Sequence, residues 1–133
     1  GEAVCEAVAK AQNKPKVVIQ GSAIGYYGNC GPEPVNEESA KASTDSVEEH
    51  GVRRAIIRTA MVLGDGGALA KMVGPFKAGL GSYLGAGHQG VSWIHIKDEV
   101  RAIIFLIENE KCKGIFNLSS IHPLTFNKFA DTL

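Results

Sequence analysis

The chain has 133 residues, of which 44% are hydrophobic, and its 14 lysines and arginines are balanced by 14 aspartates and glutamates. This length suits one domain with a single core, and the zero net charge argues against nucleic acid or an anionic membrane as a partner. No apolar run approaches the roughly 20 residues of a membrane-spanning helix, and the N-terminus carries charge where a signal peptide is apolar. We therefore expect a soluble, cytoplasmic protein.

The first part of the chain contains a helix, an apolar strand and a polar segment. Apolar residues recur at helical spacing over residues 2–12, and Asn13-Lys14-Pro15 ends this helix. The apolar run at residues 16–20 predicts a parallel strand that is covered on both faces. Residues 29–36 form a loop rich in glycine and proline, and residues 37–50 have only weak helical character.

The middle of the chain contains a long apolar strand, a helix and a glycine-rich loop. The strand is expected over residues 53–63, followed by a sharp turn at residues 64–67. An amphipathic helix is predicted over residues 68–80, with an interruption at Gly74-Pro75. The glycine-rich loop is expected over residues 79–90.

The last third contains two short strands and two helices. Residues 91–96 alternate between the faces of a predicted strand, and Asp98 is expected to cap the following helix. A further strand is predicted over residues 115–118, and Thr125 is expected to cap the final helix. Alternating helices and strands are typical of an α/β fold, a doubly wound parallel sheet with helices on both faces. The apolar faces of the two helices comprise Val100, Ile103, Ile104 and Ile107 in the first and Phe126, Phe129 and Ala130 in the second.

The cysteines show no metal-binding pattern. Cys5, Cys30 and Cys112 are far apart, and neither a C-x-x-C motif nor a His/Cys cluster has the spacing of a zinc site. We expect reduced thiols and no metal ion.

Two motifs that contain glycine do not fit the functions they suggest. Residues 85–90 match G-x-G-x-x-G, but a strand-like segment follows where the dinucleotide fingerprint needs a helix N-terminus. Residues 20–24 suggest a nucleophile elbow, yet Gln20 and Ile24 occupy the positions of its two glycines. Ser22 is therefore expected either to donate a hydrogen bond to a ligand or merely to end the strand.

Polar and aromatic residues follow the two central strands. Tyr26 and Tyr27 lie just past the first strand, where open α/β sheets bind ligands, and either both contact a ligand or one packs the turn. Arg58 ends an apolar strand, so a phosphate or an acidic side chain is expected beside it. His95 is expected to be a half-buried histidine with a hydrogen-bond partner and not a catalyst.

Four segments of the chain resemble, in the right order, the C-terminal half of an extended short-chain dehydrogenase/reductase of the NAD(P)-dependent epimerase type. They are most similar to a subgroup of epimerase-like proteins that resembles bacterial YfcH. The resemblance covers nearly the whole chain. The segments are KVVIQGSAIGYYG, AIIRTAMVLGDGG, GVSWIHIKDEVRAIIFLIE and GIFNLSS.

The resemblance implies an incomplete Rossmann-type domain over residues 1–133 that binds NADP or NAD and acts on a small carbonyl or hydroxyl substrate. It places the serine that orients the reacting group at Ser22, with Tyr26 as a second polar contact. It also implies that residues 65–92 contribute to a small substrate-binding region, and it is compatible with a homodimer. The residues it assigns to the cofactor are Gly21, Arg58, Thr59, Met61 and Val62.

The chain also departs from that family. The cofactor fingerprint of the family lies in an N-terminal β-α-β unit, which would precede this chain. No lysine stands four residues after Tyr26, Tyr27 or Tyr83, although a Tyr-x-x-x-Lys pair supplies the acid/base of hydride transfer in the family. The alternative to an enzyme is therefore a non-catalytic dinucleotide-binding sensor or interaction protein of the same fold.

Two further departures concern the substrate and the length of the chain. Val91 stands where sugar-nucleotide epimerases tend to carry an arginine for the diphosphate, which argues against a nucleotide-sugar substrate. The segment between the two central strands is shorter than in the family. We therefore expect residues to be missing near Ala42-Ser43 and beyond both termini.

Overall fold

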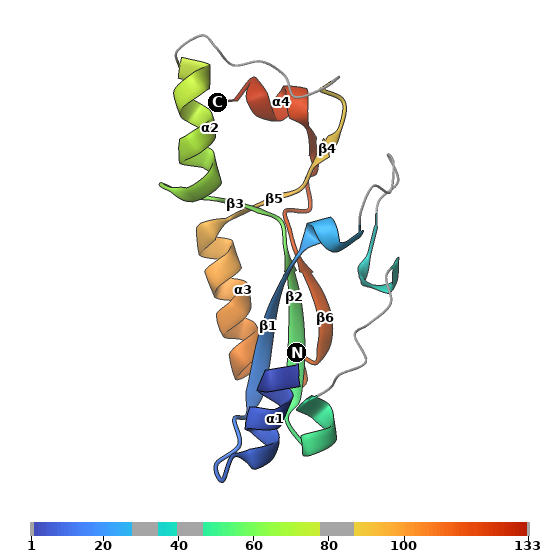
Figure 1. The fold of residues 1–133 in the computed structure, drawn as a ribbon. Helices are drawn as coiled ribbons and strands as arrows, with labels where there is room; N and C mark the ends of the chain where they lie inside the picture. The colour runs from blue at the N-terminus through green and yellow to red at the C-terminus, as the bar shows by residue number, and fades with distance from the viewer. Residues whose placement is uncertain (1, 28–34, 40–46, 78–86, 133) are drawn as a thin grey trace.

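The computed structural model describes residues 2–27, 35–39, 47–77 and 87–132. A main parallel sheet lies between helices, and a smaller unit lies beyond the carboxyl ends of its strands (Figure 1). The elements, with η for 3₁₀ helices, are α1 (Glu2–Lys10), β1 (Val17–Ala23), η1 (Ile24–Tyr27), η2 (Glu37–Ser39), η3 (Val47–His50), β2 (Arg53–Thr59), β3 (Met61–Leu63), α2 (Gly67–Lys77), β4 (Gly90–Val91), β5 (Trp93–His95), α3 (Ile96–Glu108), β6 (Gly114–Leu118), β7 (Leu124–Thr125) and α4 (Phe126–Ala130).

The main sheet has three parallel strands in the order β1-β2-β6. The middle strand, β2, pairs along both edges, and its residues 54–58 are buried. Strand β1 is also apolar, but its residues 17–20 are only half-buried, because only one of its edges pairs with a described strand. The predicted parallel α/β sheet is therefore confirmed, whereas the full burial predicted for β1 is wrong for the described part of the chain.

Helices α1 and α3 pack on opposite faces of this sheet. Ile57 and Leu118 form a core cluster with Leu106 of α3. Val18 points to the other face of the sheet and packs against a cluster that contains Val8 of α1. This two-sided cover is what a parallel sheet with apolar residues on both faces requires.

The smaller unit consists of two strand pairs and two helices. Strands β3 and β5 are parallel, whereas β4 and β7 are antiparallel. Thr125 is the N-cap of α4, which confirms the predicted cap. The inward face predicted for this last helix is also confirmed, because its residues form the buried cluster of this unit. That cluster comprises Val91, Phe126, Phe129 and Ala130.

The single strand predicted over residues 53–63 is two strands in different sheets. The Ala60 amide donates to the Leu118 carbonyl of β6 at 3.0 Å, whereas the Met61 amide donates to the Ser92 carbonyl at 3.1 Å. The backbone thus changes its pairing partner between adjacent residues. A continuous apolar run does not reveal such a change, since both strands are apolar.

Two other element predictions need correction. Helix α2 runs through Gly74-Pro75 without the predicted interruption, because a proline removes one helical hydrogen bond without necessarily ending the helix. The strand predicted over residues 91–96 is divided into β4 and β5 at Ser92. The loops predicted at residues 29–36 and 79–90 fall largely outside the described residues.

The N-terminus of α3 is capped by His95 and not by Asp98. The His95 Nδ1 atom accepts a hydrogen bond from the Lys97 amide at 3.2 Å. Asp98 lies in the first turn of the helix, where it pairs with Arg101 at 3.3 Å. His95 is exposed, and not half-buried as predicted.

The apolar face predicted for α3 is mostly not the face that packs on the sheet. Val100, Ile104 and Ile107 remain 46%, 47% and 49% exposed. The pattern correctly identified an amphipathic helix, but it could not show which stripe meets the sheet. The residues of α3 that are buried or half-buried toward the sheet are Glu99, Ala102, Ile103 and Leu106.

None of the helices in the described ranges is long and apolar enough to cross a membrane. Cys5 and Cys112 are free thiols, and Cys30 lies outside the described residues.

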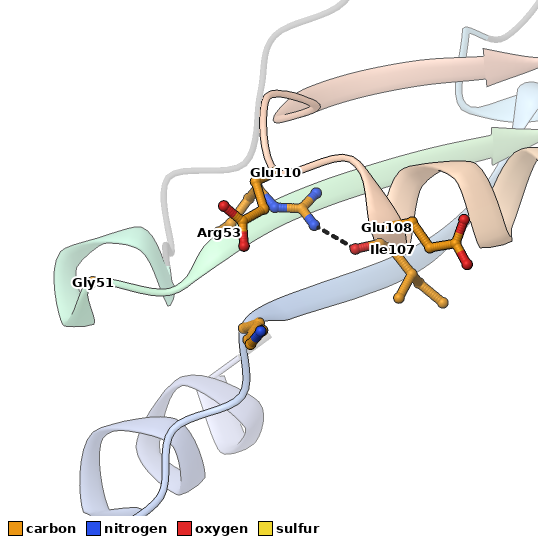
Figure 2. Close-up of a pocket in the computed structure, with 6 residues that line it drawn as sticks. Gly51, Arg53, Ile107, Glu108 and Glu110 are labelled. Atoms are coloured by element: carbon orange, nitrogen blue, oxygen red, sulfur yellow. Dashed lines mark hydrogen bonds between the residues drawn. The ribbon is translucent and has the colours of Figure 1, made fainter.

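Arg53 joins the start of β2 to the last turn of α3. Its guanidinium donates to the carbonyl oxygens of Leu106 at 2.8 Å, Cys112 at 2.6 Å and Ile107 at 3.0 Å, and Figure 2 shows it reaching toward Ile107. Carbonyls at a helix C-terminus lack partners within the helix and carry partial negative charge. Arg53 therefore supplies both the donors and the positive charge that this helix end needs.

Replacing Arg53 by alanine is expected to lower the free energy of unfolding by about 1–3 kcal/mol, because three carbonyls lose a charged donor. Arg53→Lys should recover only part of this loss, since an ammonium cannot reproduce the planar fork. Urea unfolding followed by circular dichroism measures both. Arg101→Ala is the control, because it removes only an exposed pair with an expected effect below about 0.5 kcal/mol. Equal effects at positions 53 and 101 would contradict the proposed role.

Candidate functional site

Three polar side chains form a row across the main sheet near the carboxyl ends of its strands. Ser22 of β1 is in register with Arg58 of β2, and Arg58 is in register with Asn117 of β6. Residues in parallel register project to the same face, so the three side chains are neighbours. Ser22 and Asn117 are half-buried, and Arg58 is 3% exposed. Open α/β sheets bind ligands at this edge.

The 3₁₀ turn η1 folds two tyrosines over this row. Arg58 Nη1 donates to Tyr27 Oη at 2.7 Å, and Tyr27 Oη donates to Asn117 Oδ1 at 2.8 Å. The guanidinium carbon of Arg58 lies 4.5 Å from the ring centroid of Tyr26 and 4.7 Å from that of Tyr27, within the range of cation–π attraction. Tyr27 is half-buried in this network, whereas Tyr26 is 53% exposed.

Arg58 is buried with few hydrogen-bond partners. In the part of the chain that the structure describes, its guanidinium donates to the Tyr27 phenol and contacts no carboxylate, so the acidic partner predicted for Arg58 is not found there. The Glu37 carboxylate, which lies nearby, instead accepts a hydrogen bond from the backbone N–H of Asn117 at 2.8 Å. A guanidinium has five N–H donors, and among the described residues most of those on Arg58 have no partner.

Thr59 projects to the opposite face, where it meets a buried carboxylate. Its hydroxyl donates to Glu99 Oε1 of α3 at 2.8 Å, and Glu99 is 6% exposed. The second oxygen of Glu99, Oε2, is buried and has no hydrogen-bond partner among the described residues. A buried polar atom of this kind costs free energy, so the Thr59 hydroxyl carries the hydrogen bonding of this carboxylate.

The remaining residues predicted for the cofactor are spread over three environments. Gly21 is exposed, and a Cβ atom there would meet nothing within 4 Å. Met61 packs against the cluster of the smaller unit, whereas Val62 packs against the cluster under α3. The predicted site residues therefore do not all meet on one surface. Ser22, Arg58 and Tyr26 lie together at the carboxyl edge, whereas Thr59, Met61 and Val62 lie in other environments.

Two other parts of the described chain do not offer a better site. No group of three or more histidine, cysteine, aspartate or glutamate side chains in the described ranges could hold a metal ion. Figure 2 shows a depression at the amino end of the sheet, but the Arg53 guanidinium that lines it already donates to carbonyls of α3. The residues that line it are Lys16, Gly51, Arg53, Ile107, Glu108 and Glu110.

Sequence reasoning did not identify Asn117 or Glu99 as members of these networks. The sequence contained a signal for each of them. Asn117 interrupts the apolar run Gly114–Leu118, and Glu99 lies on the stripe of α3 that faces the sheet. A polar residue in such a position must find a partner. The partners themselves, 90 and 40 residues away along the chain, follow only from the register of the strands and the packing of α3.

Comparison with known proteins identifies the family. Residues 39–119, more than half of the chain, match the model of the NAD dependent epimerase/dehydratase family. The chain belongs to this family. Its relatives include the epimerase family protein YfhF of Bacillus subtilis, with 31% identity over 95% of this chain and 46% of YfhF. Another is the epimerase family protein SA0724 of Staphylococcus aureus, with 38% identity over 93% of this chain and 47% of that protein.

Similar solved structures support the fold of this family member. The structure of the human epimerase family protein SDR39U1 with NADPH has a TM-score of 0.76 and 28% identity, and the match covers 97% of this chain and 48% of that one. The nucleoside-diphosphate sugar epimerase from Corynebacterium glutamicum has a TM-score of 0.83 and 26% identity, over 98% of this chain and 31% of that one. The predicted Rossmann-type fold is confirmed, and the YfcH-like subgroup stays a prediction.

The chain spans about half the length of the curated relatives that it matches. It is also shorter within the matched region. The match to the epimerase family protein SH2119 of Staphylococcus haemolyticus extends over 147 positions, against 133 residues in this chain, so at least 14 positions of the match have no counterpart here. The shortening predicted near Ala42-Ser43 agrees with such a difference, but residues 40–46 lie outside the described residues and its place stays a prediction.

Replacing Tyr27 by phenylalanine is expected to lower the free energy of unfolding by about 1–3 kcal/mol, because Arg58 and Asn117 both lose a partner. A double-mutant cycle with Asn117→Ala, measured by urea unfolding, isolates the hydrogen bond between the two side chains. We expect a coupling energy of about 0.5–1.5 kcal/mol. Purely additive losses would show that the two residues do not interact.

Replacing Thr59 by valine is expected to cost about 1–3 kcal/mol of stability, because the buried carboxylate of Glu99 loses its donor. Thr59→Ser keeps the hydroxyl and should cost less than about 1 kcal/mol, the difference being the lost methyl group. Adding Glu99→Leu to Thr59→Val should restore most of the lost stability, since neither partner then remains unpaired. Equal thermal midpoints for the serine and valine variants would argue against this hydrogen bond.

Proposed function

We propose that this chain is the substrate-orienting part of an NAD(P)-dependent, epimerase- or dehydratase-like oxidoreductase that acts on a small carbonyl or hydroxyl substrate. The observation that carries the proposal is the row formed by Ser22, Arg58 and Asn117 at the carboxyl edge of the sheet. Membership of the epimerase/dehydratase family supports the reaction class.

Within this site, the Ser22 hydroxyl would donate a hydrogen bond to the reacting oxygen and orient it. Tyr26, the more exposed of the two tyrosines, would supply a second polar contact. Tyr27 has a different role, since its hydroxyl is already engaged by Arg58 and Asn117. It would hold Arg58 in place and not contact the substrate.

The residues of this edge fit a dinucleotide cofactor. Arg58 is buried, and several of its N–H donors have no partner among the described residues, which suits the phosphates of NADP or NAD. Gly21 leaves open space beside the strand. When bound, the cofactor would supply the hydride acceptor or donor of the reaction. The nicotinamide side that the resemblance gives to Thr59, Met61 and Val62 is not supported by these contacts, since Thr59 bonds to Glu99 on the opposite face and the other two pack into separate clusters. The similar structure of human SDR39U1, which contains NADPH, supports this choice of cofactor.

The smaller unit is proposed to contribute to the substrate pocket through residues 65–92. Leu69 and Met72 of α2 pack against Val91 and the α4 cluster, beyond the carboxyl end of the main sheet (Figure 1). Val91 is 7% exposed in that cluster. An apolar, buried side chain cannot bind a diphosphate, which supports a small substrate over a nucleotide sugar.

The second candidate function is a dinucleotide-binding sensor that keeps the fold without catalysis. It is favoured by the lack of a lysine four residues after Tyr26, Tyr27 or Tyr83. Without that pair, proton transfer during hydride transfer needs another group.

The intact protein isolated from its source distinguishes the two functions. For the enzyme, NADPH should bind and be oxidised with at least one member of a panel of small aldehydes and ketones. Ser22→Ala should then lower kcat/KM by about 10²-fold without changing NADPH affinity, as expected when one donor to the reacting oxygen is removed. Ser22→Thr, which keeps a hydroxyl, is the matched control and should retain most activity. Tight NADPH binding without turnover, unaffected by Ser22→Ala, would instead identify a sensor.

A further inference from the structure

Two hydrogen bonds in series connect the buried cation Arg58 to the side chain of Asn117. Arg58 Nη1 lies 2.7 Å from Tyr27 Oη, and Tyr27 Oη lies 2.8 Å from Asn117 Oδ1. A guanidinium can only donate, so the phenol oxygen accepts from Arg58, and the single phenol proton is donated to Asn117. The amide of Asn117 therefore sets the orientation of the Tyr27 hydroxyl and, through it, the position of the guanidinium.

The partners that the described residues give to Arg58 are uncharged. The Tyr27 phenol accepts its hydrogen bond, and its guanidinium carbon lies 4.5 Å and 4.7 Å from the ring centroids of Tyr26 and Tyr27. Arg58 is 3% exposed, and a charge buried to this degree is usually paired with an opposite charge. The described part of the site thus orients the guanidinium without neutralising it.

The carboxylate of Glu37 reaches the same residue of β6 but bonds to its backbone. Glu37 Oε1 accepts from the backbone N–H of Asn117 at 2.8 Å, whereas Tyr27 donates to the Asn117 side chain. This bond satisfies a backbone donor on a strand that pairs with β2 alone in the described sheet. Asn117 therefore holds an acidic side chain on its backbone and presents a neutral amide to the Arg58 network.

We propose that Asn117 is the positioning residue of an anion site at Arg58, and that the neutrality of its amide leaves the charge of Arg58 available to a phosphate. The inference rests on the proposed function, because the cofactor phosphate is the anion in question. Holding Tyr27 requires an acceptor at position 117. Binding an anion requires that this acceptor carry no negative charge, and asparagine meets both requirements.

Aspartate at position 117 separates these two requirements. It has nearly the shape of asparagine, and its carboxylate would accept the Tyr27 hydrogen bond at least as well, since charge-assisted hydrogen bonds are stronger. The carboxylate would, however, lie one phenol oxygen away from the guanidinium and offset the positive charge that attracts an anion. The substitution is therefore expected to preserve the fold and to weaken anion binding.

Isothermal titration calorimetry of the intact protein with NADPH, and separately with inorganic pyrophosphate, tests this expectation without turnover. Asn117→Asp should raise both dissociation constants by about 10-fold or more, because like charges then face each other, while the melting temperature changes by less than about 3 °C. Asn117→Ala should weaken binding and also lower the melting temperature, since Tyr27 loses its acceptor. A purely structural role predicts weaker binding only where the melting temperature falls. An aspartate variant with wild-type affinity would therefore overturn the proposal.

Asn109→Asp is the matched control for the added charge. Asn109 is the C-cap of α3, at the amino end of the sheet, and its Oδ1 atom accepts from the Lys111 amide at 3.1 Å, which a carboxylate can also do. The length of β2 from Arg53 to Arg58, roughly 16 Å, exceeds the Debye length, so both dissociation constants should change by less than about twofold. Equal losses for the two aspartate variants would show an effect of net charge and overturn the proposal.

A second background distinguishes positioning from direct contact with the anion. In Tyr27→Phe the link between Asn117 and Arg58 is already broken, so adding Asn117→Ala should weaken binding by less than about twofold. A loss as large as in the wild-type background would show that Asn117 touches the anion itself, which contradicts a positioning role.

Failure of this inference and failure of the proposed function give different results. Binding of NADPH or pyrophosphate with the expected variant pattern, but no oxidation of NADPH, removes the enzyme and supports this inference. Turnover in which Asn117→Asp keeps wild-type affinity removes this inference and leaves the enzyme. An intact protein that binds neither NADPH nor pyrophosphate has no anion site at Arg58 and also overturns the inference.

Discussion

Strand β2 is the element on which the described structure depends, because within the main sheet it alone is hydrogen-bonded along both edges. Its two ends carry arginines with different tasks. Arg53 at the start holds the last turn of α3 through three carbonyls, whereas Arg58 near the end organises the candidate site. The position of α3 on the sheet and the geometry of the site are therefore both tied to one strand.

Burial of Arg58 is the constraint that shapes the carboxyl edge. A buried guanidinium needs partners, and within the described ranges Arg58 contacts one phenol oxygen and the faces of two rings. A guanidinium is weakly hydrated and stacks well on aromatic rings, so this environment is tolerated. The two tyrosines therefore differ: Tyr27 bonds to Arg58 and Asn117, whereas Tyr26 is more exposed and stacks on the Arg58 guanidinium.

The exposed surfaces of the chain carry the sequence patterns of buried elements. The β1 edge and the exposed residues Val100, Ile104 and Ile107 of α3 are of this kind, and similar structures contain about as much protein again as this chain covers. Both features lie where the three-stranded sheet of the described chain leaves apolar residues uncovered.

The sequence by itself determined the α/β class, most helices and strands, the α4 cap at Thr125 and the family, because these follow from short-range periodicity and contiguous motifs. Tertiary structure alone decided the rest. It chose His95 over Asp98 as the cap of α3, divided the apolar run at Ala60 between two sheets, and brought Tyr27 and Asn117 together. The physical reason is that strand register and helix rotation fix which distant residues meet, and neither leaves a periodic signal in the chain.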